Sequence, residues 1–352
     1  MEIRELLQLA ADVNASDLHL RAGLAPVLRI DERLKPQTDF GLLTSDDLWA
    51  LLCQVTTEEQ RQTFNTEKEL DFAYTLGTSA RFRINAMWQR KSISIACRRV
   101  PFEVPTIDEL DLPQICKELV LKPRGLILIT GPTGVGKSTT MAAMIRYLNE
   151  KMDRNIICIE DPIEYEHQNI KSIIAQREVG DDTNSFHDAL IRVLRHDPDV
   201  IVIGEMRDLD TIATAITAAE TGHLVLSTLH TPDAPQTIDR LIDIFPPNQQ
   251  TQIRYQISQE ILAIMSQVLL PRAAGKGMIA AFEIVMANPA IRNLIRESRT
   301  YEIPSYIHLQ KSIGMQSLDD SLADLVKRQK ITRDVAMTKT SNPKRLAELI
   351  RY

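Results

Sequence analysis

A glycine-rich turn at residues 131–138, GPTGVGKS, carries the strongest chemical signal in the sequence. It fits the pattern G-x-x-x-x-G-K-[ST], and it stands between an apolar run, LILIT, and a stretch rich in alanine and methionine. A strand, a turn and a helix in that order form the setting in which this pattern binds phosphate. Glycines let successive backbone N–H groups point inward at the positive end of the helix. The turn is therefore predicted to hold a nucleoside triphosphate.

The side chains of this turn have separate predicted roles. Lys137 reaches the outer phosphates, the Ser138 hydroxyl ligates Mg²⁺, and Thr139 adds a hydrogen bond to the phosphates. The predicted nucleotide contacts are Thr133, Gly134, Val135, Gly136, Lys137, Ser138 and Thr139. A chance match in a glycine-rich loop is the alternative, and the flanking strand and helix patterns argue against it.

A second apolar run, in DPDVIVIGEMRD at residues 197–208, ends in a carboxylate, Glu205. Open α/β sheets bind ligands at the carboxyl ends of their strands, so Glu205 is a candidate for the phosphate site. The generic magnesium-binding strand carries Asp where this one has Gly204. Magnesium must therefore be held differently, and Glu205 is predicted to hold the water shell of the ion.

A third apolar run, in IICIEDPIEYEH at residues 156–167, is followed by Glu160, Asp161 and Glu164. Glu164 is predicted to orient and deprotonate the water that attacks the outer phosphate. Taken singly, each of these acids could equally be a helix N-cap or a solvated loop carboxylate. Their joint position beside a phosphate-binding turn favours the catalytic interpretation.

Two histidines, His223 and His230, flank a six-residue apolar run in AAETGHLVLSTLHT. Their separation is odd, so a strand would point them to opposite faces and they could not share one metal ion. A histidine at a strand end is usually a hydrogen-bonding core residue. Near an outer phosphate, His230 would instead sense the nucleotide state, and the residues alone leave that choice open.

The order of elements predicts the frame that positions these groups. The apolar runs GLILIT, NIICIE, DVIVIG and LVLSTL alternate with helical patterns at 137–152, 184–195 and 209–221. Such alternation implies βαβ crossovers and a parallel-rich sheet covered on both faces, hence an α/β fold. After residue 235 we expect mostly helix, apart from the strand IAAFEIVM.

The chain is long enough for two domains. Residues 1–100 mix short alternating strands with amphipathic and polar helices, so a small α+β domain is expected there. Prolines in PFEVPTIDELDLP indicate an extended, stiff connector at 101–113. The remaining residues, 114–352, are assigned to the α/β domain and its helical C-terminal part.

The overall composition limits the kinds of partner that the chain is expected to bind. The 41 basic and 47 acidic residues give a net charge of -6, which disfavours a nucleic acid partner unless the chain carries a local basic patch. Its apolar runs are too short to cross a bilayer, and the N-terminus lacks the basic region of a signal peptide. We expect a cytoplasmic protein without direct membrane insertion.

Four motifs, GPTGVGKST, IEDPIEYEH, DPDVIVIGEMRD and TGHLVLSTLHT, occur in this order. Together the sequence resembles the secretion ATPases of type II secretion and type IV pili. AIRNLIRE is similar to the pilus-retraction subfamily in particular, and the four-cysteine zinc module of assembly members has no counterpart in this sequence. The resemblance extends back to ASDLHLRAG and ARFRINAMWQR. The resemblance covers nearly the whole length and implies a RecA-like ATPase domain, a PAS-like N-terminal domain and a ring-shaped homohexamer.

The resemblance also implies a function. It indicates a motor that binds ATP and Mg²⁺ and powers retraction of type IV pili at the cytoplasmic face of the inner membrane. The implied partners are the inner-membrane platform protein of the pilus and an accessory retraction ATPase. The alternatives are a pilus assembly or secretion ATPase, an accessory retraction protein that does not hydrolyse ATP, and a nucleic-acid translocase.

Positive charge is needed to stabilise a transferring phosphoryl group. The resemblance assigns an arginine-finger role to the N-terminal segment that carries Arg81, Arg83, Arg98 and Arg99, without saying which of them acts. A solvated strand face is the alternative. It also assigns AIRNLIRE to retraction, although ordinary core packing would explain the apolar stripe of Ile291, Leu294 and Ile295 equally well.

Overall fold

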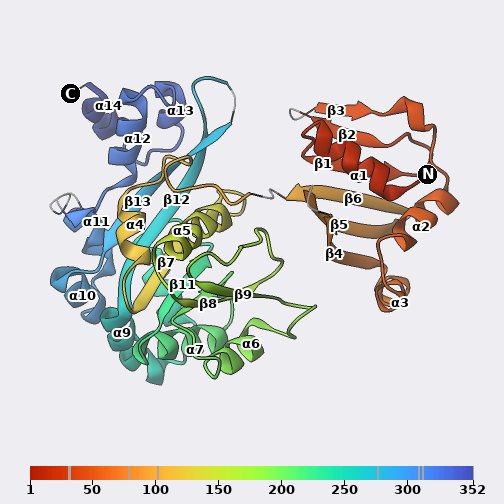
Figure 1. Cartoon of the computed structure of the whole chain (residues 1–352). Coiled ribbons are helices and arrows are strands. Elements are labelled where there is room, and N and C mark those ends of the chain that lie inside the picture. Colours follow the sequence, from red (N-terminus) through yellow and green to blue (C-terminus); the bar gives the residue numbers. More distant parts are fainter. Residues whose placement is uncertain are drawn as a thin grey trace. The chain divides into compact units, whose positions relative to one another are not determined.

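A computed structural model describes residues 1–30, 33–77, 80–100, 103–275, 277–307, 310 and 313–351. The chain forms two compact units, Met1–Glu103 and Val104–Tyr352 (Figure 1).

In the described residues, the N-terminal unit is a six-stranded antiparallel sheet in the order β3-β2-β1-β6-β5-β4. Its strands are β1 (Asp17–Arg21), β2 (Val27–Ile30), β3 (Arg33–Pro36), β4 (Glu69–Leu76), β5 (Ala80–Gln89) and β6 (Ser92–Val100). Its helices are α1 (Ile3–Asp12), η1 (Thr38–Phe40), α2 (Ser45–Cys53) and α3 (Glu58–Glu67). Alternate strand residues such as Leu18 and Leu20 bury in one core with helix residues such as Leu6. The predicted α+β mixture is confirmed, except that the exposed edge strand β3 was not predicted.

The C-terminal unit holds a seven-stranded sheet in the order β13-β12-β7-β11-β10-β8-β9, counted in the described residues. Its strands are β7 (Gly125–Thr130), β8 (Asn155–Glu160), β9 (Ile173–Glu178), β10 (Val200–Ile203), β11 (Leu224–Leu229), β12 (Ile261–Pro271) and β13 (Met278–Met286). The pairs that join β12 through to β9 are parallel, whereas β13 runs antiparallel to β12. The predicted parallel-rich α/β core is confirmed.

Helices cover both faces of this sheet (Figure 1). On one face, α4 (Ile115–Val120) and α5 (Lys137–Lys151) pack on alternate residues such as Ile127. The other face carries α6 (Phe186–Val193), α7 (Leu209–Glu220), α8 (Ala234–Asp243), α9 (Pro247–Glu260) and α10 (Pro289–Arg296). Burial on both faces explains why the strands read as continuous apolar runs.

The remaining helices follow α10. They are η2 (Thr300–Glu302), α11 (Ile303–Ile307), α12 (Leu318–Lys327), α13 (Arg333–Met337) and α14 (Pro343–Arg351). The last three form a separate small core with Leu270 and Ile279 of the β12–β13 hairpin.

Two strands of the C-terminal unit were not predicted. The expectation of mostly helix after residue 235 is wrong for β12, whose eleven residues follow α9 with no breaker between Glu260 and Ile261. A run buried on both faces cannot be told from a buried helix by periodicity. β9 was missed because it is the edge strand and its residues are largely half-exposed.

The predicted extended connector at 101–113 is wrong for the residues from Val104 onward. Pro101 and Phe102 lie outside the described part of the chain. Val104, Ile107 and Leu112 are buried, and the last two belong to the core beneath α4 and α5. The chain from Val104 onward therefore packs on the C-terminal unit and is not an extended link.

The apolar stripe of the AIRNLIRE segment is part of the main core. Ile291, Leu294 and Ile295 of α10 are at most 3% exposed and pack in the cluster that covers one face of the sheet. Arg292 reaches from α10 to the last carbonyls of α9, at Ser258 and Gln259. The stripe thus has the packing role that was the alternative to a specific function.

Replacing Leu294 by alanine is expected to lower the free energy of unfolding by about 3 kcal/mol, because it empties a packed position. Arg296, exposed on the same helix, is the matched control, and its replacement by alanine should change that energy by less than about 0.5 kcal/mol. Chemical denaturation followed by circular dichroism measures both. Equally small effects would show that α10 is not anchored in the core.

Candidate nucleotide-binding site

The predicted motifs meet at one edge of the sheet. β7, β11, β10 and β8 are consecutive parallel neighbours, so their carboxyl ends lie together. The phosphate-binding turn follows β7, His230 follows β11, Glu205 follows β10 and Glu160 ends β8. The structure thereby brings together groups that are up to 99 residues apart in the sequence.

The turn has the backbone conformation that its glycines allow. Gly134 and Gly136 have φ angles of +82° and +87°, in the left-handed region that glycine occupies without strain. Gly136 is the N-cap of α5, which begins at Lys137. The predicted strand, turn and helix are therefore in place, with the N-terminus of α5 directed at the phosphate position.

Lys137 is held inside the turn. Its Nζ donates to the carbonyl oxygens of Gly131 (2.8 Å) and Pro132 (3.1 Å). Burial lowers the pKa of Lys137, while the charges of Glu205 and Glu164 act to raise it. The side chain is only 8% exposed, so this cation is pre-positioned and partly desolvated, which strengthens its attraction for phosphate.

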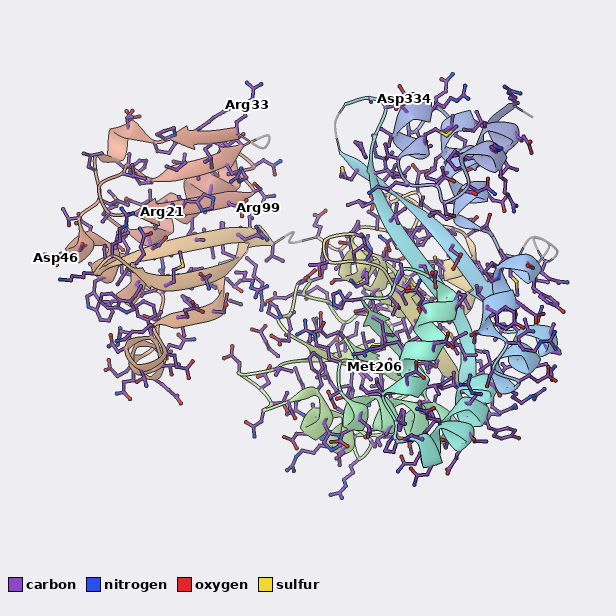
Figure 2. The ribbon with its side chains drawn as sticks, turned by 180° about the vertical axis from the view of Figure 1, so that it is seen from behind. Arg21, Arg33, Asp46, Arg99, Met206 and Asp334 are labelled. Atoms are coloured by element: carbon purple, nitrogen blue, oxygen red, sulfur yellow. The ribbon has the colours of Figure 1, made fainter. Side chains whose placement is uncertain are left out.

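Glu205 and His230 form a polar network with the turn. The Glu205 carboxylate lies 2.7 Å from Arg207 Nε and 3.2 Å from His230 Nε2. On its other side, His230 Nδ1 lies 3.4 Å from Thr133 Oγ1 and 3.5 Å from Lys137 Nζ. Met206, labelled in Figure 2, is 5% exposed and anchors this segment in the core.

The two histidines have different environments. His223 Nδ1 lies 2.9 Å from the Ala218 carbonyl at the end of α7, so its contacts are structural. His230 is exposed and contacts Glu205 and the turn. These contacts suit the sensor role considered above, which stays a prediction.

Close strand approach explains the glycine that replaces the usual Asp. A Cβ added at Gly204 would lie 3.3 Å from the Ile159 carbonyl oxygen and 3.4 Å from the Glu160 Cα. The Gly204 carbonyl also accepts a hydrogen bond from Thr228 Oγ1 (2.6 Å). A side chain there would require the β8 backbone to shift by a few tenths of an ångström.

The loop after β8 is pinned by hydrogen bonds. Gln176 Nε2 donates to Glu160 Oε1 (2.9 Å) and to the Tyr165 carbonyl (2.8 Å). Ile163 N donates to Glu178 Oε2 (3.0 Å). Between these anchors Glu164 remains exposed, close enough to Lys137 and Glu160 to affect both of their pKa values.

Oxygen donors at this edge suit a magnesium ion. Ser138 lies in the first turn of α5, and Glu205 and Glu164 supply carboxylates across from the turn. Hard divalent cations prefer hydroxyl, carboxylate and phosphate oxygens. The residues present therefore fit Mg²⁺, and the assignment of Ser138 and Glu205 to it stays a prediction.

Three site residues were missed by the sequence analysis. Arg207 directly follows the strand-end Glu205 motif and could have been noticed there. Tyr165 Oη lies 3.1 Å from Thr139 Oγ1, a contact between distant segments. Gln267 lies on β12 and contacts the turn, and its strand was itself not predicted.

The four N-terminal arginines divide between two faces of their sheet. Arg83 pairs with Arg98 in the β5–β6 register, and Arg81 lies two residues before Arg83, so these three share one face. Arg99, labelled in Figure 2, lies on the opposite face and donates to the Ala11 carbonyl of α1 (3.2 Å). The structure places them in the N-terminal unit, and the arginine-finger role stays a prediction.

Two half-buried groups beside the site have pKa values shifted in opposite directions. Burial raises the pKa of Glu160 to about 7, with further contributions from Glu164 and Glu178, against the hydrogen bond from Gln176. Burial lowers the pKa of His167 to about 4. Between pH 4.5, the usual pKa of Glu, and about pH 7, Glu160 lowers the free energy of unfolding as pH rises. In this range the carboxyl has lost its proton in the unfolded chain and still holds it in the folded one. Between about pH 4 and 6.5, the usual pKa of His, His167 raises the free energy of unfolding as pH rises.

Glu160→Gln removes the contribution of Glu160 to the pH dependence of stability and leaves that of His167. Relative to the unmodified chain, the variant is expected to gain stability as pH rises from 4.5 to about 7, reaching on the order of 3 kcal/mol above pH 7. Denaturant midpoints measured from pH 4 to pH 8 test this. Parallel profiles for the two proteins would contradict a proton held on Glu160.

Comparison with known proteins identifies the family of the chain. A family model described as "Type II/IV secretion system protein" matches residues 53–327. The chain is 44% identical to the type IV pilus retractation ATPase PilT of Pseudomonas aeruginosa, over 97% of this chain and 99% of the relative. It is 39% identical to the type IV pilus ATPase PilU of the same organism, over 100% of this chain and 92% of the relative.

A solved structure of the pilus retraction motor PilT with bound ADP matches with a TM-score of 0.92 and 46% identity, covering 99% of each chain. This match confirms the predicted fold class, a RecA-like P-loop core with a smaller PAS-like N-terminal domain. The resemblance drawn from the motifs is confirmed as well. The chain belongs to the type II/IV secretion system protein family.

Proposed function

We propose that this chain is an ATP-hydrolysing motor that powers retraction of type IV pili and hence twitching motility. The observation that carries the proposal is the meeting of the glycine-rich turn, Glu205 and His230 at one sheet edge, in a chain that is 44% identical to a pilus retraction ATPase over almost its whole length. Extended similarity of that kind covers the motifs outside the site as well as those within it.

The residues of the site have separate proposed roles in ATP hydrolysis. The N–H groups of the turn and Lys137 hold the phosphates of ATP, and Glu164 orients the attacking water and takes its proton. Ser138 and Glu205 hold Mg²⁺, which neutralises developing charge on the phosphates when bound. Because His230 contacts both the turn and Glu205, it is suited to report whether an outer phosphate is present.

We further propose a homohexamer that acts at the cytoplasmic face of the inner membrane on the platform protein of the pilus. Among the described residues, no helix has the length and apolar character needed to cross a membrane. Nucleic acid is not a proposed partner, since the net charge of -6 disfavours it. Arginines of the N-terminal unit are the proposed source of additional positive charge during turnover.

An accessory retraction ATPase is the second candidate, because the chain is also 39% identical to PilU. A pilus assembly ATPase is a third, and the four-cysteine zinc module expected of that group has no counterpart in the sequence. A gene deletion separates retraction from assembly: more surface pili with loss of twitching supports retraction, and cells without pili support assembly.

Phosphate release by the purified chain tests the enzyme activity. Glu164→Gln is expected to lower kcat by at least about 100-fold while ATP still binds, because it removes only the proton acceptor. Lys137→Ala should abolish binding and hydrolysis together. Glu118→Gln, an exposed carboxylate on α4, is the control and should keep full activity. A chain that binds ATP without releasing phosphate would favour an accessory role.

Arginine variants test the source of the positive charge. If one arginine of the Arg81, Arg83 and Arg98 face acts as the finger, its replacement by alanine should lower kcat on the order of 1,000-fold. Arg99→Ala should instead destabilise the N-terminal unit by about 1 to 3 kcal/mol, because the Ala11 carbonyl loses its donor. Unchanged kcat in all four variants would remove the finger role from this segment.

A further inference from the structure

A buried glutamine on β12 contacts the phosphate-binding turn from within the core. Gln267 is 2% exposed. Its Nε2 donates to the Val135 carbonyl (2.5 Å), and its Oε1 accepts from the Thr140 hydroxyl (2.8 Å). Val135 lies in the turn and Thr140 in the first helical turn after it, so one amide bridges the loop and the helix.

The orientation of that amide is fixed by its partners. A carbonyl oxygen can only accept a hydrogen bond, so the amino group of Gln267 must face Val135 and its oxygen must face Thr140. The backbone of the same residue is equally close to the turn. A Cβ added at Gly131 would lie 2.4 Å from the Gln267 carbonyl oxygen, so β12 by itself requires glycine at the first position of the turn.

Peptide geometry turns this contact into a constraint on phosphate binding. The Val135 carbonyl and the Gly136 N–H belong to one planar trans peptide unit and point in opposite directions. A carbonyl drawn inward to Gln267 therefore directs the Gly136 N–H outward, to the side where the phosphates bind. Without the donor, the buried carbonyl would be unsatisfied and the peptide would gain by turning over.

We propose that Gln267 is a positioning residue for the nucleotide, one that keeps the turn in its phosphate-binding conformation. The inference rests on the proposed ATPase function and deepens it. Its effect is on the fraction of molecules with a competent turn, and the apparent dissociation constant rises as that fraction falls. Saturating nucleotide selects the competent form, so the maximal rate is affected less than the affinity.

The test uses Gln267→Met in the full-length chain, because methionine has similar volume and cannot donate a hydrogen bond. The control is Asn149→Leu. Asn149 is a buried amide at the opposite end of α5 that binds backbone groups of Gln168, Ile170 and Ser172. Both variants should lower Tm, whereas only the loss of Gln267 alters the turn.

For Gln267→Met, the ADP dissociation constant and the ATP KM are expected to rise by at least about 10-fold, with kcat falling less than about threefold. For Asn149→Leu, both binding quantities should stay within about twofold of the unmodified chain. Calorimetric titration with ADP and steady-state phosphate release measure them. An ADP dissociation constant and a KM left unchanged by Gln267→Met would overturn the proposal.

Thr140→Val supplies a second variant in case Gln267→Met does not fold. It removes the hydroxyl that orients the amide and should raise the ADP dissociation constant by roughly threefold, with no further effect when combined with Gln267→Met. No rise with Thr140→Val in a folded protein would also count against the proposal. Failure of the unmodified chain to bind ADP would refute the proposed ATPase function itself, which separates the two.

Discussion

The structure depends on one property of the peptide bond. A loop that presents its N–H groups to a ligand must direct the carbonyls of the same peptide units toward the protein. Buried carbonyls need donors, and here they are supplied by two side chains. Lys137 donates to Pro132 and Gln267 donates to Val135, the carbonyls whose peptide units carry the Thr133 and Gly136 N–H groups. Lys137 also donates to Gly131, whose peptide unit has no N–H because Pro132 follows it. The Val135 carbonyl is thus held from the core side of the turn by Gln267, whereas Lys137 lies in the turn itself and is also predicted to reach the phosphates.

Further hydrogen bonds hold β12 beside β7 and the turn. Thr130, the last residue of β7, donates from its hydroxyl to Ser266 (2.9 Å), next to Gln267. At its other end β12 continues from α9, whose last carbonyls accept hydrogen bonds from Arg292, while Arg254 of α9 donates in return to the Ile295 carbonyl of α10. The AIRNLIRE segment is therefore hydrogen-bonded to the end of α9, where the chain continues into the strand that contacts the turn.

The sequence alone could predict what is encoded locally. Lys137, Ser138 and the glycines stand in a short pattern whose strand and helix flanks are visible in the residues, and Glu205 and Glu164 follow apolar runs that must end at one sheet edge. Gln267 and Tyr165 could not be found in this way, because their importance comes from contacts with residues 132 and 26 positions away. The strand β12 was missed since burial on both faces removes periodicity. The packing of Val104, Ile107 and Leu112 was not predicted either, because the prolines around them indicated an extended connector.

The contacts of His230 favour one tautomer of its neutral ring. Lys137 Nζ can only donate, and it lies on the Nδ1 side of the ring, whereas the Glu205 carboxylate on the Nε2 side can only accept. An imidazole with one ring proton satisfies both when that proton is on Nε2. His230 then accepts from the turn and donates to Glu205, so the hydrogen bonds run in one direction from β7 across β11 to β10. A carboxylate accepts up to four hydrogen bonds, so Glu205 keeps capacity for a metal-bound water while it holds Arg207 and His230.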